Sequence, residues 1–405
     1  MRPASRDTHR ILNLAKDRLI DRSPIDMAHA NRHERMRKAR VAVLAVVAAT
    51  IALALSSIAL PLLQDASEAP RRALTSYVTH DFIMILDDSE FTFLNGVTGG
   101  SGTAGDPFVI NGWQIDASIM GSGIMIFTTT AYYQISNVRI YGAGGTCIQL
   151  FSAPNGRVND SLFENSDSAI IVMSSDGMSI ANNTIISQGF GGIMVMDSNM
   201  TDISNNSIDQ CETYGLIVTE LNNVTVQDNT VTNANGFGMA AIVADNLTFA
   251  RNNASSNIFC GMIVNDTRNM LVYGNDFTMN GRYGLYIGNV STAMVFHNRF
   301  IGNPEQAVQG PNTTALGWDD GYPSGGNYWS DYIGVDLMSG PDQDISGNDG
   351  IGDTPYAFAT GGTDRYPFVN EDMQLIPEFA TIMVPIVGLT AVAVMLQRRK
   401  RAGTT

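Results

Sequence analysis

The chain has 405 residues, enough for one large domain or two of ordinary size. Residues 64–376 carry nine Arg, no Lys and thirty-three Asp or Glu, and the difference between nine and thirty-three gives this stretch a net charge of −24. Such an acidic surface excludes nucleic acid as the expected partner, because neutralising phosphates needs Lys and Arg. Three cysteines, Cys147, Cys211 and Cys260, are an odd number and predict small buried residues rather than a disulfide framework.

The N-terminal region predicts a membrane-directed segment. Residues 1–40 carry eleven Lys or Arg against five Asp or Glu, and residues 41–63 are almost wholly apolar and long enough to span a bilayer. We expect a basic cytoplasmic tail followed by a transmembrane helix. In the alternative, residues 1–35 belong to a wrongly assigned start, the chain begins at Met36, and the apolar run is a signal peptide with small residues at 56–59.

Residues 123–310 contain eight copies of a repeat of about 23 residues. In the last six copies the pattern apolar-x-x-Asn-x-apolar recurs at a constant step, and a Gly recurs in phase with it, as at Gly192, Gly215 and Gly238. Two earlier copies, near 135–140 and 158–163, lack the Asn. The repeated Asn residues are Asn183, Asn206, Asn229, Asn252, Asn275 and Asn298.

Each repeat has the pattern of three short strands. After the Gly, apolar residues alternate, as in Ile193 and Val195, so these side chains point to one face. Residues that suit tight turns separate this segment from two further apolar segments. The sequence therefore predicts an all-β protein, a right-handed parallel β-helix in which stacking of the turns creates a continuous core.

The Asn column predicts a ladder of side-chain amides between turns that lie about 4.8 Å apart. We also expect these Asn residues to adopt the left-handed backbone of a sharp turn. Because the ends of a β-helix expose strand edges, residues 64–122 are predicted to be a linker and N-terminal cap, and residues 311–376 a C-terminal cap.

Three motifs flank the repeats: GGSGTAGDPFVINGW at 99–113, GNYWSDY at 326–332 and DGIGDTPY at 349–356. They resemble the opening and closing segments of the NosD-like β-helix proteins that are common on archaeal cell surfaces. The resemblance covers residues 91–369 and implies a parallel β-helix. Members of this family are often described as periplasmic and copper-binding, so copper is a cofactor that the resemblance alone implies.

The C-terminal tail, residues 377–405, carries a second resemblance. Pro377, Glu378 and Phe379 precede an apolar run that ends before a basic cluster at 398–401. This layout is similar to a PEF-CTERM sorting signal, which implies cleavage by a sortase-type membrane enzyme and attachment to the cell surface. The alternative is an uncleaved transmembrane helix with a basic tail. Both interpretations predict an extracytoplasmic, membrane-anchored protein.

The donors that copper favours are scarce between the two apolar segments. Copper sites favour His, Cys and Met, and this region has only His80 and His297. We expect its Met residues to fill the core, among them Met125, Met194, Met239 and Met262.

An acidic loop at 342–353 is the best candidate for a metal site, because carboxylate and amide oxygens with intervening Gly suit Ca²⁺. Its spacing differs from a regular calcium-binding loop, and the alternative is a solvated turn. The candidate ligands are Asp342, Asp344, Asn348, Asp349 and Asp353.

Two further columns of the repeat bear on function. Asp197, Glu220 and Asp266 share one position, and carboxylates one turn apart approach the separation of about 5–5.5 Å used by retaining glycosidases. The alternative is a hydrated turn. Tyr214, Phe237 and Tyr283 share another position, with Cys260 between the last two. They are candidates for stacking on sugars, although the favoured interpretation is an internal aromatic ladder.

Three functions follow from these patterns. The favoured one is a non-catalytic structural or binding protein that presents a long flank to surface glycans or envelope components. A carbohydrate-active hydrolase or lyase is the second, and copper handling, implied by the resemblance, is the third. Fold class alone does not choose among them.

Overall fold

The computed structural model describes residues 77–314 and 316–372. The predicted membrane and sorting segments at 1–63 and 377–405 lie outside these residues. Helix within the described part is limited to two short 3-10 segments, η1 (Asp88–Glu90) and η2 (Phe93–Asn95). No helix there has the length and apolar composition needed to cross a bilayer.

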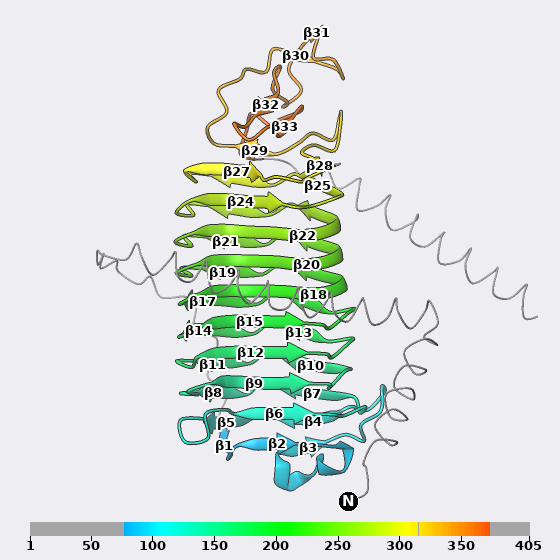
Figure 1. Ribbon diagram of the computed structural model, residues 1–405, viewed down its shortest axis with the longest axis vertical. Helices are drawn as coiled ribbons and strands as arrows, with labels where there is room; N and C mark the ends of the chain where they lie inside the picture. Colours follow the sequence, from blue (N-terminus) through cyan, green and yellow to red (C-terminus); the bar gives the residue numbers. More distant parts are fainter. Residues whose placement is uncertain (1–76, 315, 373–405) are drawn as a thin grey trace, which may run out of the picture. The chain divides into compact units, whose positions relative to one another are not determined.

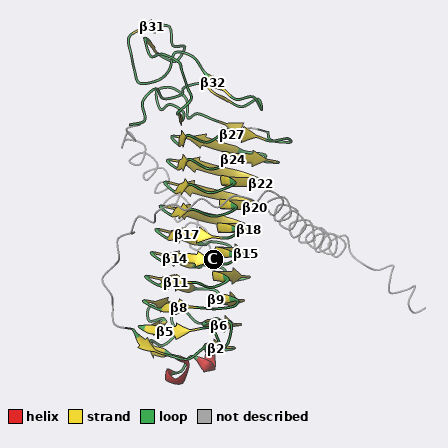
Figure 2. Cartoon of the chain, turned by 90° about the vertical axis from the view of Figure 1, so that its left-hand side faces the viewer, coloured by secondary structure: helices red, strands yellow, loops and turns green. Residues whose placement is uncertain are grey.

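The described chain is a parallel β-helix of the right-handed type, with about nine turns of about 23 residues. Figure 1 shows the turns stacked in chain order, and Figure 2 shows their strands edge-on. The expected fold class is therefore confirmed. The turns begin earlier than the repeat pattern indicated, because Phe108–Asn111 and Trp113–Asp116 already pair in parallel with the following turn.

Each turn contributes strands to three stacks, which we call the first, second and third sheets; the first two join into one continuous sheet where single long strands run through both. The first sheet comprises β2 (Ile83–Ile85), β6 (Ile124–Phe127), β9 (Thr146–Phe151), β12 (Ser168–Met173), β15 (Gly191–Met196), β18 (Tyr214–Gln227), β20 (Phe237–Ala250), β22 (Cys260–Tyr273), β24 (Tyr283–Gly288) and β27 (Glu305–Gln309). The second comprises β4 (Phe108–Asn111), β7 (Tyr133–Ser136), β10 (Gly156–Asn159), β13 (Ser179–Ala181), β16 (Asp202–Ser204), the later halves of β18, β20 and β22, then β25 (Ala293–Phe296) and β28 (Leu316–Gly317). The third comprises β1 (Val78–Thr79), β5 (Trp113–Asp116), β8 (Arg139–Tyr141), β11 (Leu162–Glu164), β14 (Thr184–Gln188), β17 (Ser207–Cys211), β19 (Thr230–Thr232), β21 (Asn253–Ser255), β23 (Asp276–Thr278), β26 (Arg299–Ile301) and β29 (Tyr328–Trp329).

The register places each residue over its copy in the next turn. Ile203 pairs with Val226, and Val226 pairs with Phe249, so the step of 23 is kept through the central turns. Because every copy of a core position faces the interior, Ile193, Val195 and their equivalents form one continuous core. Phe277, Phe300 and Trp329 stack within it, with ring centroids 5.2 and 4.4 Å apart.

The repeated Asn residues form a buried ladder along one corner. The backbone N–H and the side-chain amide of Asn206 both donate to the Asn229 side-chain oxygen, at 3.0 and 2.9 Å, and the same amide donates to the Ile180 carbonyl. The left-handed backbone of this corner belongs to the preceding residue, as in Asn205 and Asp228. The expectation that the ladder Asn itself is left-handed was wrong, because its side chain must turn inward to meet the next turn.

A second ladder follows another corner, and the sequence analysis missed it. Asn257 donates to the Asn280 side-chain oxygen and Asn280 to that of Asn303, at 3.0 Å each. These three residues also recur at a step of 23, which was the available signal. Earlier copies of the column hold Cys211 and Ala234, so the column does not stand out as an Asn repeat.

The N-terminal cap closes the first turn. It contains η1, η2 and β3 (Val97–Gly99), which pairs antiparallel with β4. The Asp88 carboxylate accepts bonds from the hydroxyls of Thr129 and Thr130, and Phe91 stacks on Phe108 with centroids 4.6 Å apart. The GGSGTAGDPFVINGW motif therefore helps to close the N-terminal end of the β-helix.

The C-terminal cap ends the Asn ladder on a buried carboxylate. Asn298 donates to the Asn327 side-chain oxygen at 3.0 and 2.9 Å, and the Asn327 backbone N–H donates to Asp364 at 2.7 Å. Trp329 also donates to Asp364, at 2.9 Å. A side-chain carbon on Gly326 would lie 1.9 Å from the Asp364 oxygen, so this position requires Gly. Asp364 is fully buried, and burial raises the pKa of its carboxyl to about 7 against the opposing effect of these bonds.

The rest of this cap is built on short hairpins, β30 (Met338–Ser339) with β31 (Ile345–Ser346) and β32 (Tyr356–Ala357) with β33 (Thr363–Asp364). Tyr356 stacks on Trp329 with ring centroids 4.4 Å apart and donates to Asp331 at 3.1 Å. The GNYWSDY and DGIGDTPY motifs thus hold the cap on the last turn.

Replacing Asn229 by Ala will test the ladder. The change leaves the buried Asn206 donors without their acceptor, so we expect the free energy of unfolding to fall by about 3 kcal/mol. Chemical denaturation measures the loss. Asn265→Ala is the matched control, because Asn265 points outward and bonds only to the neighbouring Asp266. Equal losses in the two variants would contradict a special role for the ladder.

Asp364 will make stability depend on pH. Its pKa rises from the ordinary value of 3.8 to about 7 in the folded state, so folding takes up a proton between these values. The resulting stabilisation is complete below the lower value and is lost as the pH rises through the upper one. We expect the wild type to lose more stability than Asp364→Asn between pH 5 and pH 8 in thermal unfolding. Parallel pH profiles would rule this out.

Candidate functional site

The outer face of the first sheet differs from the other outer surfaces of the β-helix. Its strands alternate between core residues and outward apolar residues, whereas the outward positions of the third sheet are mainly polar, such as Thr184, Ser207 and Thr230. We call the outward side chains of the first sheet the apolar face. It includes Phe127, Phe151, Ile171, Met194, Ile242 and Ile263.

Aromatic rings lie along one edge of this face. Tyr214 belongs to a cluster with Ile217 and Ala240 that is separate from the main core, and Phe237 packs against it. The expected internal ladder of Tyr214, Phe237 and Tyr283 was therefore wrong. A side-chain carbon on Gly215 would lie 2.1 Å from Val231 inside the β-helix, so the chain turns inward at this Gly. The preceding Tyr214 lies outside the main core but is itself buried in the separate cluster.

Two Phe residues and Tyr286 complete this aromatic strip, which consists of Phe190, Tyr214, Phe237, Phe259, Tyr283 and Tyr286. Phe190 and Tyr214 meet edge to face with ring centroids 5.3 Å apart, as do Phe237 and Phe259 at 5.6 Å. The Arg282 guanidinium lies over Tyr283 at 4.7 Å. The side chains of Phe237, Phe259 and Tyr283 are half-buried, so their rings are partly accessible to a ligand.

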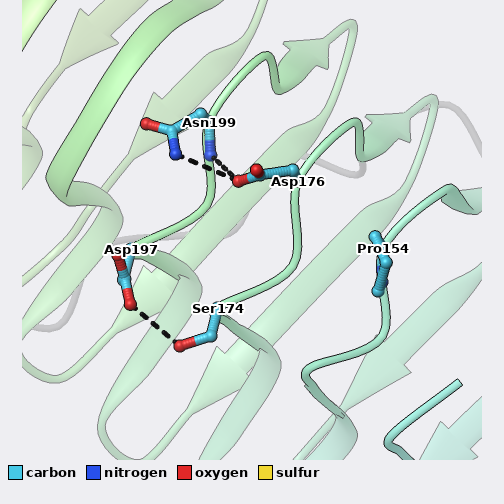
Figure 3. Close-up of a pocket in the computed structure, with 5 residues that line it drawn as sticks. All are labelled: Pro154, Ser174, Asp176, Asp197 and Asn199. Carbon is cyan, nitrogen blue, oxygen red and sulfur yellow. Dashed lines mark hydrogen bonds between the residues drawn. The ribbon is translucent and has the colours of Figure 1, made fainter. Parts of the chain in front are cut away.

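A polar corner borders the opposite edge of the apolar face, where the first sheet turns into the second. Figure 3 shows that Asp197 and Ser174 lie together there, with Asp176 beside Asn199. The Ser174 hydroxyl donates to Asp197 at 2.9 Å, and the Asn199 backbone N–H donates to Asp176 at 2.7 Å. With Pro154, these residues line an open hollow of about 290 Å³.

The predicted carboxylate column lies at this corner. Asp197, Glu220 and Asp266 all have a left-handed backbone, with φ of 48°, 55° and 54°. Val243 occupies the position between Glu220 and Asp266, so the column is interrupted. Asp266 accepts bonds from Asn265 and Asn289, and desolvation raises the pKa of its carboxyl. The bond from Asn289 joins successive turns, and a catalytic role for the column stays a prediction.

The acidic loop lies in the C-terminal cap, away from the apolar face. Asp353 accepts bonds from the backbone of Leu337 and Met338 at 3.0 Å each, and Asp349 accepts one from Ile351 at 3.0 Å. The remaining candidate ligands, Asp342, Asp344 and Asn348, are exposed. Calcium binding by this loop also stays a prediction.

Donors of the kinds that hold most protein-bound metals do not converge in the described chain. Across residues 77–314 and 316–372, no group of three or more His, Cys, Asp or Glu could hold a metal ion. His80 is in the N-terminal cap, and His297 bonds to the Ser324 carbonyl at 2.8 Å beside the C-terminal cap. The three thiols are buried, and burial raises their pKa to about 12.

Comparison with known families identifies the family to which this chain belongs. A family model described as "Periplasmic copper-binding protein (NosD)" matches residues 105–334, more than half of the sequence. The chain belongs to the NosD family. The NosD match covers most turns of the β-helix together with part of each cap. No match was found among the curated proteins.

Solved structures similar to this NosD-family chain are β-helix proteins. They include a mutant of the periplasmic alginate epimerase AlgG, at 15% identity over 54% of this chain and 70% of that chain, with a TM-score of 0.41. The Azotobacter vinelandii mannuronan C-5 epimerase AlgE6 A-module has 16% identity over 52% and 73%, with a TM-score of 0.41. DFA-IIIase from Arthrobacter chlorophenolicus A6 without its lid has 14% identity over 52% and 71%, with a TM-score of 0.42. Likeness at this level says nothing about the chemistry of this chain.

The copper in the NosD description can be tested against the donors present. A site of His or Cys donors does not fit, because the two His are bonded in different caps and the thiols are buried and protonated. The Met residues divide into two groups. Met239 and Met262 are buried in the core as expected, whereas Met125 and Met194 face outward, contrary to expectation. Soft thioether donors are therefore present on the outer surface.

Thiol reactivity will test the burial of the cysteines. With pKa values near 12 and no access for solvent, the thiols of Cys147, Cys211 and Cys260 should not react with a thiol reagent in the native protein at pH 8. All three should react in denaturant. Mass spectrometry counts the labels, and rapid labelling of any one thiol in the native protein would contradict the structure.

Proposed function

We propose that this NosD-family protein is an extracytoplasmic binding protein that holds a surface carbohydrate chain along the apolar face. The observation that carries the proposal is the aromatic strip outside the core, beside a sheet whose outer face is apolar over successive turns. A contiguous apolar patch on the outer surface of a protein is typical of a binding site. The apolar C–H face of a sugar ring packs on an aromatic ring.

The two edges of the face supply different contacts. Arg282 lies over Tyr283 on the aromatic edge, and the hollow lined by Asp176, Asp197 and Asn199 lies on the polar edge. A polymer that crosses between them would rest its apolar faces on rings and direct hydroxyls to amides and carboxylates, the usual combination in a carbohydrate site. Repetition of the turn favours an extended ligand over a compact one.

Charge restricts the ligand further. The region that contains the β-helix has a net charge of −24, to which Asp176, Asp197 and Glu220 at the corner beside the apolar face contribute. A polyuronate would be repelled by this field. Neutral or amino-sugar polymers of the envelope are therefore the proposed ligands.

Location outside the cell is part of the same proposal. The NosD family description is periplasmic, which supports an extracytoplasmic β-helix. The apolar segments at 41–63 and 379–396 lie outside the described residues, and their sequence supports membrane anchorage at the cell surface. Mass spectrometry of the mature termini distinguishes an uncleaved anchor from sortase-type processing.

Substitutions in the aromatic strip will test the proposal. We expect Phe237→Ala and Tyr283→Ala each to weaken binding of a neutral or amino-sugar oligosaccharide about fivefold, since a ring contact is worth about 1 kcal/mol. Titration calorimetry on the full-length chain measures the affinity. Tyr273→Ala is the matched control, because Tyr273 stacks on Phe296 outside the second sheet, away from the strip.

Either of two results would contradict this proposal. Unchanged affinity in both strip variants would remove the strip as the binding site. Release of reducing ends by the wild type, abolished in Glu220→Gln, would favour a hydrolase or lyase that uses the carboxylate column.

A further inference from the structure

The described chain contains ten copies of the motif Asn-x-Ser/Thr, which is the acceptor motif for N-linked glycans in secreted proteins. Turns alone supply some copies, because Asn suits a left-handed corner and Ser and Thr suit the residues around it. Accessibility separates a working acceptor from a turn residue. The side-chain amide of the Asn must be exposed and free to react, and the hydroxyl two residues later must not be buried.

Two copies span the corner between the second and third sheets, which also holds the buried Asn ladder. Asn182 and Asn205 have the left-handed backbone of this corner, with φ of 57° and 55°, and both are exposed. The next residue in each copy is a ladder Asn, such as Asn183, whose amide turns inward. The hydroxyl residues, Thr184 and Ser207, take outward positions at the start of β14 and β17. Each copy therefore presents its amide and its hydroxyl on the outer surface.

Two further copies have similar exposure. Asn223, with φ of 57°, lies within β18 at the corner between the first and second sheets, and Asn312, with φ of 55°, lies in the loop between β27 and β28. Both Asn residues are exposed, Thr225 is half-buried on the outer face, and Thr314 is exposed. The side-chain amides of these four Asn residues make no hydrogen bond to residues 77–314 or 316–372.

The other six copies serve the fold. Figure 3 shows Asn199 beside Asp176, which accepts bonds from the Asn199 backbone N–H at 2.7 Å and from its side-chain amide at 3.1 Å. The hydroxyl residues of the Asn199 and Asn265 copies, Thr201 and Thr267, are only 2% and 1% exposed. In the last four copies the Asn side chain bonds to the chain or its oxygen is buried: Asn159, Asn246, Asn253 and Asn289.

The two groups differ in what a glycan would displace. At Asn205 a glycan would extend from an exposed corner into water and would break no contact. At Asn199 the half-buried amide is held against Asp176 of the preceding turn, so a glycan there would disturb a contact between turns. This selection holds whether transfer comes before folding or after it, because a chain with a glycan at Asn199 could not complete that contact.

We propose that the mature protein carries N-linked glycans at the four exposed copies, Asn182, Asn205, Asn223 and Asn312. Transfer forms a bond between the side-chain Nδ2 and the anomeric carbon of a phosphate-linked glycosyl donor. The bond from that carbon to the phosphate oxygen breaks, the phosphate leaves with the bonding electrons, and the amide loses one proton. The inference rests on the extracytoplasmic location proposed above and is independent of carbohydrate binding.

The position of the first two copies is compatible with that binding. Asn182 and Asn205 lie on the corner between the second and third sheets, which does not border the apolar face. Glycans at these two residues therefore leave the aromatic strip accessible.

The test uses the full-length chain purified from its native host. Mass spectrometry of its peptides, with fragmentation that keeps the glycan attached, identifies each modified Asn. We expect glycan at the four exposed copies and none at Asn199 or Asn265. The same chain produced in a bacterial cytoplasm that lacks a transferase should have the mass of the unmodified sequence.

Ser207 provides a matched pair of variants for expression in the native host. Ser207→Ala removes the hydroxyl of the motif, so it should abolish the glycan at Asn205 and leave that at Asn182 unchanged. Ser207→Thr keeps the hydroxyl and should retain both glycans. Ser207 is exposed on β17, so neither change alters the core. A circular dichroism spectrum equal to that of the wild type confirms the fold of each variant.

Three results would overturn the inference. They are absence of glycan from all four exposed copies, occupancy of Asn199 and Asn265 equal to that of Asn205, and persistence of the Asn205 glycan in Ser207→Ala. Loss of the full-length chain when protease is added to spheroplasts tests the location separately. A digested chain without glycan contradicts this inference alone, whereas a protected chain contradicts the location on which the proposed function also rests.

Discussion

Every structural feature of this protein depends on the exact vertical stacking of successive turns. Parallel pairing at a step of about 23 residues places each side chain above its own copy, so one favourable contact is repeated along the whole column. The Asn ladders, the aliphatic core and the stack of Phe277, Phe300 and Trp329 all result from this repetition. The buried amides have a strong effect because each is satisfied only when the next turn is in register.

The same stacking leaves strand edges and ladder donors without partners at the two ends of the β-helix, and the caps supply those partners. Each amide in the Asn ladder donates toward the C-terminal end, so its last member, Asn327, needs an acceptor, which Asp364 provides. The motifs that resemble the NosD family form these caps: Trp329 and Tyr356 stack over the final turn. The family match at residues 105–334 covers mainly the repeated turns, so membership of the family indicates the architecture more directly than it indicates a ligand.

The interior of the β-helix is filled, so binding must use the outer surface, and the three outer faces differ in chemistry. The third sheet presents mainly polar side chains, whereas the first presents rings, aliphatic groups and thioethers next to an acidic corner.

The sequence alone determined the fold, the step of the repeat and the position of the Asn ladder, because periodic contacts leave a periodic record in the residues. It also held the signal for the outward direction of Met194, which alternates with Ile193 and Val195. Only the tertiary structure decided that Tyr214 lies outside the core, since the turn at Gly215 breaks strand alternation. Only the structure showed that Asn327 and Asp364 meet, because the cap brings together segments that share no repeat. Periodicity in the sequence predicts the contacts that recur in every turn. A contact that occurs only once depends on how distant segments of the chain pack together.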